Sequence, residues 1–407
     1  MKKNVLLITH NFWPEHFPIN DIAKNLGTKY FNLTVLTGKP NYPFGKIFNS
    51  YNPYYFQKEF FYKNVEIFRV PVVPRGRGSF IFIFLNYLSF ILLSLLFGYF
   101  LLKKKKIDLI FVYAPSPVIH ALVGIFFKFL RKKPLIIWLQ DIWPYTLIST
   151  GYIKNKIIIN ILNLIITYIY KRSDKILVQS KSFLRSIKKN YHCKNLIYVP
   201  NHSSSFSFSR DKKYKINMKF NQKQFNIVYS GNIGTVQDFD VIFKAAKKLT
   251  DFPIKFYFFG EGNKKKFLQK KIILEKISNI FICDFIEKKK LFTIIKKCSA
   301  LIITMKSDKY LDLIIPSKVQ FYLSCKKPII AVCSGEVRKI IIASNSGLVS
   351  KSGDYKKLCK NILYMYRLKD SVKFNTYKLN SYNYFKRNFT INIVAKKIRH
   401  IINQLIK

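Results

Sequence analysis

Acidic residues are scarce in this chain of 407 residues. Only 20 Asp and Glu stand against 71 Lys and Arg, which gives a formal net charge of +51. Such an excess indicates a polyanionic partner, although a composition rich in Lys, Ile, Asn, Phe and Tyr, as favoured by an AT-rich genome, explains part of it. No recognition helix, zinc-ligand spacing or aromatic RNA-binding signature is present, so nucleic acid is not the expected partner. The remaining charge fits an anionic membrane surface.

Paired cysteines are missing as well. The six cysteines are scattered without a CxxC pair, which excludes a zinc or disulfide framework and predicts reduced thiols in a cytosolic compartment. At the N-terminus, two lysines precede an apolar stretch of only five residues, Val5–Thr9. We therefore expect a first strand there rather than a signal peptide.

Glycine is absent between Thr9 and Gly27, where a Rossmann phosphate loop would need it. A dinucleotide cofactor is therefore not expected. Cofactors of any kind are expected to be absent, and no set of metal ligands is suggested.

Charge is absent from one long stretch, Phe80–Leu102, which lies between two arginines and four lysines. As a helix it would be about 34 Å long, enough to cross a bilayer. The flanking segments Val65–Val70 and Leu109–Tyr113 are nevertheless predicted to be buried strands of one sheet. Strands on opposite sides of a membrane cannot share a sheet, so we expect the run to lie in the interface or dip into one leaflet.

Short β-branched runs alternate with longer amphipathic stretches from end to end, which predicts parallel sheets covered by helices. We expect an α/β protein with two doubly wound, Rossmann-like domains. The predicted parts are an N-terminal domain (1–203) containing the apolar helix 80–102, a linker (204–224), a C-terminal domain (225–380) and a C-terminal helix (381–407) that packs back on the N-terminal domain. The predicted strands lie near residues 5–9, 33–37, 65–70, 109–113, 135–139, 175–179, 197–199, 226–230, 255–259, 280–284, 300–304 and 329–332.

The loop after the first strand, residues 10–21 (HNFWPEHFPIND), mixes stiff apolar residues with polar groups. It leads into a helix predicted from about Ile22, and doubly wound folds bind ligands at the carboxyl ends of their strands. A purely structural role is open, because Asn20 or Asp21 are good N-caps. The aromatic residues, expected to be exposed, favour function. The predicted contacts to an acceptor are His10, Glu15, His16 and Asn20.

A second polar loop follows the strand at 135–139, in the segment WLQDIWPYT (138–146). Asp141 is thereby placed at the ligand edge of the first sheet, where a carboxylate can orient or deprotonate an acceptor hydroxyl. Asp141 could equally be a turn former. Asp141 is predicted to be catalytic and Trp143 to contact the acceptor.

Three turns in the second half of the chain favour a phosphorylated ligand. Gly231 and Gly234 open a helix after a strand in YSGNIGTVQD, and a second glycine turn, FGEGN, ends another strand. In IPSK, Lys318 lies in the first turn of a helix, where a cation is tolerated best when an anion is bound. Ordinary strand-to-helix turns also use glycine.

Together these segments resemble retaining glycosyltransferases of the GT-B fold, family 4, and within it the branch that includes the fucosamine (N-acetyl-fucosaminyl) transferases of O-antigen and capsule assembly. The resemblance covers nearly the whole chain. It rests on NFWPEHFPINDIA, LTVLTGKPNYPFGKIF, LQDIWP, YSGNIG, FFGEGN, IPSKVQFYLSCKKPII and GEVRKIIIASNSG.

The resemblance implies that the N-terminal domain binds the acceptor, that the C-terminal domain binds a nucleotide-activated sugar, and that no metal takes part. Glycine-loop amides and Lys318 would then stabilise the charge on the leaving diphosphate, which makes Lys318 the second predicted catalytic residue. The donor-binding residues implied in this way are Gly231, Asn232, Gly234, Gly260, Gly262, Asp284, Phe285, Ile286, Ser317, Lys318 and Glu336.

The sequence departs from the family pattern in two ways. Many family-4 enzymes have a glutamate for the donor ribose where this chain has Phe321. They also often have an arginine and a lysine after the glycine strand, where this chain has Asn232 and Gln237. Diphosphate binding is therefore expected to depend more strongly on Lys318.

The predicted function is transfer of a sugar, with an N-acetylated deoxyhexosamine as a candidate, from a UDP-sugar to a polyprenyl-diphosphate-linked saccharide. The setting would be lipopolysaccharide, O-antigen or capsule biosynthesis at the cytoplasmic face of the plasma membrane. Two alternatives remain open: a UDP-sugar 2-epimerase of the same fold, and a non-catalytic scaffold on the membrane surface.

Overall fold

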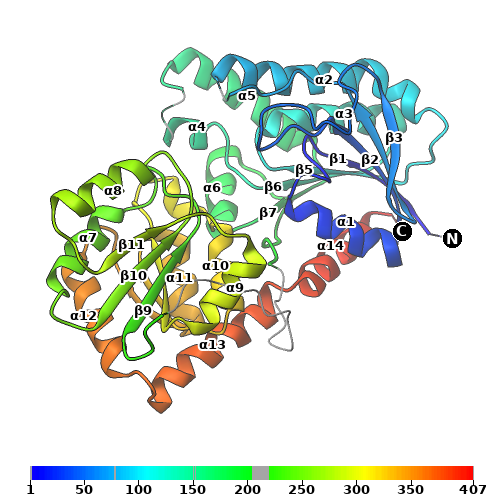
Figure 1. Ribbon diagram of the computed structural model, residues 1–407. Coiled ribbons are helices and arrows are strands. Elements are labelled where there is room, and N and C mark those ends of the chain that lie inside the picture. The colour runs from blue at the N-terminus through cyan, green and yellow to red at the C-terminus, as the bar shows by residue number, and fades with distance from the viewer. Residues whose placement is uncertain (1, 78, 150, 152, 204–219, 407) are drawn as a thin grey trace. The chain divides into compact units, whose positions relative to one another are not determined.

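The computed structural model describes residues 2–77, 79–149, 151, 153–203 and 220–406 and divides into two compact units. Unit 1 comprises Met1–Asn201 and Ile391–Lys407, and unit 2 comprises His202–Thr390. Each unit is a largely parallel sheet covered by helices (Figure 1), as the alternating sequence pattern predicts. Most of the predicted linker, 204–219, lies outside the described residues.

Unit 1 is built on an eight-stranded sheet of order β3-β4-β2-β1-β5-β6-β7-β8. All neighbouring strands are parallel except β3, which pairs antiparallel with β4 at the edge. The strands are β1 (Asn4–Ile8), β2 (Asn32–Gly38), β3 (Gln57–Tyr62), β4 (Val65–Val70), β5 (Leu109–Ala114), β6 (Leu135–Leu139), β7 (Lys175–Val178) and β8 (Leu196–Tyr198).

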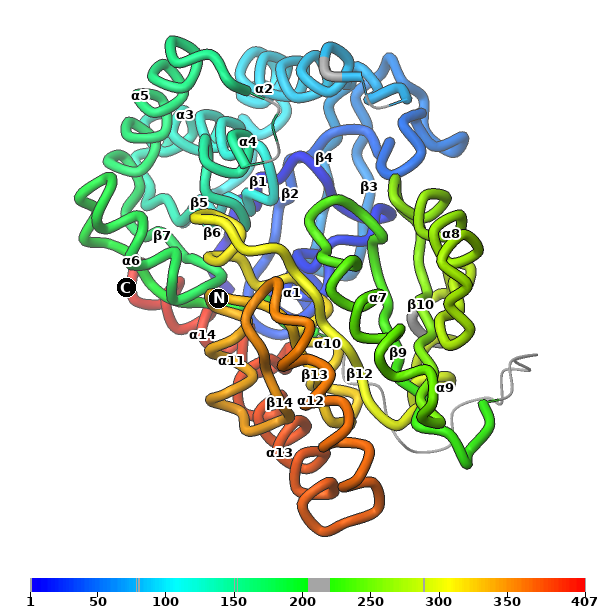
Figure 2. Tube along the Cα trace, turned by 90° about the vertical axis from the view of Figure 1, so that its left-hand side faces the viewer, coloured from blue at the N-terminus to red at the C-terminus, as the bar shows by residue number. Residues whose placement is uncertain are grey.

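Helices cover both faces of this sheet. On one face α3 contacts both α2 and α5, whereas α1 and α14 pack together on the other face (Figure 1, Figure 2). The helices of unit 1 are α1 (Pro18–Lys29), α2 (Phe80–Leu102), the short η1 (Val118–His120), α3 (Ala121–Arg131), α4 (Tyr145–Ser149), α5 (Lys156–Arg172), α6 (Lys181–Tyr191) and α14 (Ile391–Leu405).

The uncharged run forms α2, which connects two strands of one sheet. β4 precedes α2 and β5 follows it, and both belong to one sheet with β2 and β1 between them. By length and composition, Ile81–Leu102 could span a bilayer, and only 28% of its most apolar window is buried in the protein. A helix that crossed the bilayer would separate strands of one sheet, so the sheet order argues against a crossing by α2.

One stripe of α2 faces the sheet. Residues at intervals of four are buried: Asn86, Phe90, Ser94, Gly98 and Leu102. A Cβ on Gly98 would lie 3.2 Å from the ring of Phe127 in α3, so the small residues of the stripe allow close helix packing. The remaining circumference of α2 is largely apolar and exposed.

Unit 2 contains a fully parallel sheet of order β11-β10-β9-β12-β13-β14, with one apolar core cluster on each face. Its strands are β9 (Phe225–Ser230), β10 (Ile254–Phe259), β11 (Ile280–Cys283), β12 (Ala300–Thr304), β13 (Ile329–Val332) and β14 (Gly347–Ser350). Its helices are α7 (Phe239–Lys248), α8 (Lys265–Leu274), α9 (Lys288–Lys297), the short η2 (Leu311–Leu313), α10 (Ser317–Ser324), α11 (Gly335–Ser344), α12 (Tyr355–Arg367) and α13 (Val372–Asn388).

The structure corrects the sequence prediction at four elements. β3 and β14 were not predicted, because both are edge strands without a continuous apolar run. α1 begins at Pro18 rather than near Ile22, since proline fits the first helical turn, and Asn20 lies inside the helix instead of capping it. The predicted C-terminal helix from residue 381 is divided between α13 and α14, and only α14 packs on α1 in unit 1.

Candidate active site

The two predicted glycine turns of unit 2 lie against each other. A Cβ on Gly260 would come within 1.9 Å of the carbonyl oxygen of Gly231, which itself has a φ of +127°. Ile233 donates its N–H to the carbonyl of Glu261 over 2.8 Å, and a Cβ on Gly262 would lie 2.3 Å from the Ile233 oxygen. Glycine is required at these positions because backbone approaches backbone. The two turns therefore form one continuous edge at the carboxyl ends of β9 and β10.

Lys318 lies over this edge. Its Nζ is 4.0 Å from the ring centroid of Tyr229 and donates to the Tyr229 hydroxyl, and a Cβ on Gly231 would lie 3.1 Å from Nζ. No charged partner contributes to its titration, and loss of hydration alone lowers the pKa of Lys318 to about 7. An anion bound at this point would restore the charged ammonium.

Two further side chains arrange the first turn. The hydroxyl of Tyr229 donates to the carbonyl of Asn232 over 2.6 Å, and Gln237 Oε1 accepts the N–H of Gly234 over 3.0 Å. Gln237, noted as a departure from the family pattern, thus closes the turn, and the Gly234 amide that was predicted to hold phosphate is already occupied. Sequence analysis missed Tyr229, although it lies inside the quoted segment YSGNIG.

Four other predicted donor residues are exposed or only partly buried. The Asp284 side chain is 96% exposed and forms an ion pair with Lys265 at 3.0 Å, while Phe285 is 66% exposed. Ile286 is partly buried against a core cluster, and Ser317 is the exposed first residue of α10. Whether these residues contact a donor stays a prediction.

Two further positions bear on donor binding, Glu336 in α11 and Phe321 in α10, and only the first carries a carboxylate. Glu336 is buried in the first turn of α11, with Lys339 Nζ at 3.8 Å. The preceding Gly335 has a φ of +62°, and a Cβ there would come within 2.0 Å of the Asp312 carbonyl. Phe321, at the position of the family's ribose glutamate, belongs to the core cluster beneath α10, so this position offers no carboxylate.

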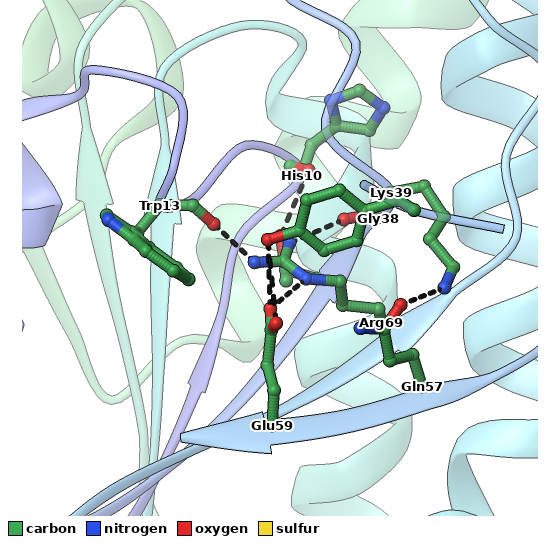
Figure 3. Close-up of polar contacts among 9 residues, drawn as sticks. His10, Trp13, Gly38, Lys39, Gln57, Glu59 and Arg69 are labelled. Atoms are coloured by element: carbon green, nitrogen blue, oxygen red, sulfur yellow. Dashed lines mark hydrogen bonds and ion pairs between the residues drawn. The ribbon is translucent and has the colours of Figure 1, made fainter. Parts of the chain in front are cut away.

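In unit 1, Arg69 holds three segments together at the carboxyl edge of the sheet (Figure 3). Its guanidinium is fully buried, pairs with Glu59 on β3, and donates to the carbonyls of Trp13 and, over 3.1 Å, Gly38. A buried charge is stable only when it is paired and hydrogen-bonded in this way. Sequence analysis missed Arg69, although a single arginine in the predicted buried strand VEIFRV is such a signal.

Lys39 is the second buried cation of this region. Its Nζ donates to Gln57 Oε1 over 2.7 Å (Figure 3), and burial together with the nearby Arg69 lowers the pKa of Lys39 to about 8.

The loop after β1 is more buried than the sequence suggested. Glu15 Oε1 accepts the N–H groups of Asn41 and Tyr42 over 2.8 and 2.7 Å, so this carboxylate holds two loops together. Burial lowers the pKa of His10 to about 4, and its ring packs on Tyr87 and other aromatics of α2. Neither side chain is free to contact an acceptor in this structure.

Of the other residues in that loop, some are buried and some are exposed. Phe12 is fully buried, which corrects the expectation that the aromatic residues are exposed, whereas Trp13 is 38% exposed. Asn20 is buried and donates to the Glu15 carbonyl over 2.6 Å. Of the predicted acceptor residues in this loop, only His16 is exposed.

Asp141 follows β6 at the same edge of the sheet. Loss of hydration raises the pKa of its carboxyl from 3.8 to about 7, a value suited to a general base at neutral pH. Trp143 is fixed beside it, with its indole N–H donating to Ser116 Oγ over 3.0 Å and its carbonyl accepting from Tyr191. Among the described residues, no three His, Cys, Asp or Glu side chains gather into a possible metal site.

Comparison with known proteins identifies the second half of the chain. Residues 211–381 match the family model described as Glycosyl transferases group 1. This segment is similar to the group 1 glycosyltransferases. The match includes the glycine turns, Lys318 and Glu336, so the edge described above lies in the part of the chain that is similar to glycosyl transferases.

Two curated relatives and one solved structure are similar to a larger part of the chain. An uncharacterized glycosyltransferase of Methanocaldococcus jannaschii is 22% identical over 303 residues, which is 74% of this chain and 75% of that protein. The probable glycosyltransferase WbjE of Pseudomonas aeruginosa is 20% identical over 52% of this chain, and the match spans 54% of WbjE. Anabaena HepE in complex with UDP superposes with a TM-score of 0.70 at 13% identity, with 100% of both chains covered. The fold is GT-B.

Proposed function

We propose that this protein transfers a sugar from a UDP-sugar to a polyprenyl-diphosphate-linked saccharide, with retention of configuration and without a metal or other cofactor. The proposed sugar is an N-acetylated deoxyhexosamine, and the proposed products belong to lipopolysaccharide, O-antigen or capsule assembly, as in the fucosamine transferase branch that the sequence resembles. The UDP complex of HepE supports a nucleotide-sugar donor.

The observation that carries the proposal is the position of Lys318. Its ammonium lies beside Gly231, where two glycine turns and the start of α10 meet, and it has no carboxylate partner among the described residues. Helix N-termini and glycine-loop amides favour phosphate, and a preorganised cation stabilises the charge that develops on a leaving diphosphate. A UDP-sugar supplies that diphosphate.

The acceptor side of the proposal rests on unit 1. Asp141 provides a carboxylate with a pKa near 7 at the carboxyl edge of the sheet. α2 provides an apolar surface for the lipid part of the acceptor and for peripheral or monotopic attachment to the cytoplasmic face of the membrane.

Incubation of membranes and purified protein with a panel of radiolabelled UDP-sugars is expected to transfer one label into the lipid fraction. The same panel with heat-inactivated protein is the control. Conversion of a UDP-sugar into its 2-epimer in solution would instead establish the epimerase alternative. If no UDP-sugar reacts and UDP does not raise the melting temperature, the protein is a scaffold and the proposal fails.

Topology tags inserted after Arg77 and after Lys104 are expected to report the cytosol at both ends of α2. The reason is that β4 and β5 belong to one sheet. Accessibility of an engineered cysteine at each position to a membrane-impermeant thiol reagent measures the side. Opposite answers at the two positions would contradict both the interfacial placement of α2 and the sheet order of unit 1.

A further inference from the structure

A second helix of unit 1 exposes an apolar stripe that the sequence analysis did not single out. In α5, five large apolar residues point away from the protein, while Ile166, Ile169 and Tyr170 on the opposite side are buried. The exposed residues, with exposed fractions of 69%, 46%, 51%, 71% and 44%, are Ile157, Ile158, Ile161, Leu164 and Tyr168. A helix in water normally places polar residues on such a face.

α2 also exposes apolar side chains, over a longer stretch than α5. Its outward side is exposed at eight large apolar residues, and the highest fractions are 70% at Phe100, 67% at Ile81 and 62% at Leu96. Both helices lie on the same face of the sheet, on either side of α3 (Figure 1, Figure 2). Contiguous exposed apolar surface of this extent marks an interaction site.

Contacts through α3 join the two helices into one surface. Arg131 at the end of α3 donates to the carbonyl of Leu102 in α2 over 2.7 Å. At the end of α5, Arg172 lies over two exposed rings, Phe129 of α3 at 5.3 Å and Tyr168 of α5 at 5.5 Å. Arg131 thus links α3 to α2, and Arg172 links α5 to α3.

Basic residues border this surface at the helix ends. Four lysines follow α2, Arg131–Lys133 end α3, and Lys154, Lys156, Lys171 and Arg172 flank α5. Apolar side chains with a basic border match a bilayer that has an apolar interior and anionic headgroups. A partner protein with an acidic rim would match the charge, but a bilayer also explains an uncharged helix of spanning length whose flanking strands share one sheet.

We infer that α2 and α5 together form a two-helix docking face for an anionic lipid bilayer, with α3 between them. The inference rests on the membrane attachment in the proposed function and extends it, because α5 becomes a second, independent point of contact. Two points fix the orientation of unit 1 about the α2 axis, which a single interfacial helix leaves free. The bilayer then lies against the helix face that α2, α3 and α5 share.

The test is flotation of the full chain with vesicles of phosphatidylglycerol and phosphatidylcholine, without donor or acceptor. The triple variant Ile157→Ser, Ile161→Ser and Leu164→Ser in α5 is expected to lower the vesicle-bound to free ratio at least tenfold. The matched control removes three exposed apolar residues of α8 in unit 2, Phe267, Ile273 and Leu274, in the same way. The control is expected to bind like the wild type.

A gain-of-signal variant removes any dependence on the loss of apolar residues. The tryptophan fluorescence added by Leu164→Trp is expected to be quenched by vesicles of brominated lipid. The fluorescence added by Ile273→Trp in α8 is not. Wild-type flotation of the α5 triple variant, or no quenching of Leu164→Trp, would overturn the inference. If the wild type is a dimer and the α5 triple variant is a monomer, the face binds a second copy of the chain. That result would also overturn the inference. Because no sugar is present, these outcomes are independent of whether transfer occurs.

Discussion

Replacing Lys318 with alanine is expected to lower sugar transfer at least a hundredfold while unit 2 stays folded. The ammonium lies over Tyr229 and beside Gly231 and has no carboxylate to leave unpaired when it is removed. Loss of one preorganised group that stabilises developing negative charge costs about 10²- to 10³-fold in rate. Initial rates with saturating donor measure the effect, and thermal unfolding of the variant verifies the fold.

The same lysine should make donor binding depend on pH. Burial lowers the pKa of Lys318 to about 7 in the free protein, and a bound diphosphate favours the protonated form, so binding takes up a proton above pH 7. UDP affinity is then expected to fall by up to about tenfold per pH unit above 7. Calorimetry in buffers of different ionisation enthalpy counts the protons. Transfer by Lys318→Ala at the wild-type rate, with a wild-type pH profile, would exclude Lys318 from the diphosphate site.

The change Asp141→Asn is expected to lower transfer about 10²- to 10⁴-fold, the range for loss of a general base. In the wild type, the rate should rise with pH through about 7, because only the ionised carboxylate accepts a proton and its pKa lies near 7. The amide keeps the shape of the side chain but cannot take up the proton. Rates measured from pH 5.5 to 8.5 test this prediction, and a variant that retains the wild-type rate and profile would contradict it.

Stability provides a second readout of Asp141 that does not depend on activity. Because burial raises the pKa from 3.8 to about 7, the folded protein holds a proton that the unfolded chain releases between these values. The contribution of this group is therefore present at low pH and is lost as the pH rises through about 7. Asp141→Asn should thus raise the melting temperature at pH 8, with a gain that shrinks towards pH 4. The exposed Asp251→Asn is the control and should show no such trend.

Local sequence pattern predicted most of the secondary structure. All twelve predicted strands are confirmed within one or two residues, and α2 has the bounds of the uncharged run, Phe80–Leu102. The strands that were missed, β3 and β14, lie at sheet edges, where one face or one neighbour is lacking and the apolar period is weak. α1 was placed four residues late, since a cap at Asn20 was preferred to proline at the first helical position.

The candidate site was predicted less completely. The glycine turns and Lys318 were found from short segments, because glycine and a lysine at a helix start have local signatures. The partners of these residues were not found: Tyr229 under the ammonium, Gln237 on the Gly234 amide, and Arg69. Their contacts join residues far apart in the chain or depend on the direction of a side chain, and the spacing of residues in the sequence predicts neither. For the same reason His10 and Glu15 were taken as ligand contacts although their neighbours occupy them.

The sequence by itself determined the alternation of strands and helices, the two-sheet architecture, the glycine turns and the uncharged run, since each follows from the order of apolar, polar and small residues. Tertiary structure alone decided how these parts are used. The sheet order argues against a crossing by α2, because the strands before and after it share one sheet. The packing of α3 against both α2 and α5 leaves two apolar stripes on one face. Burial, which depends on every neighbour at once, brought the pKa values of Lys318 and Asp141 near 7.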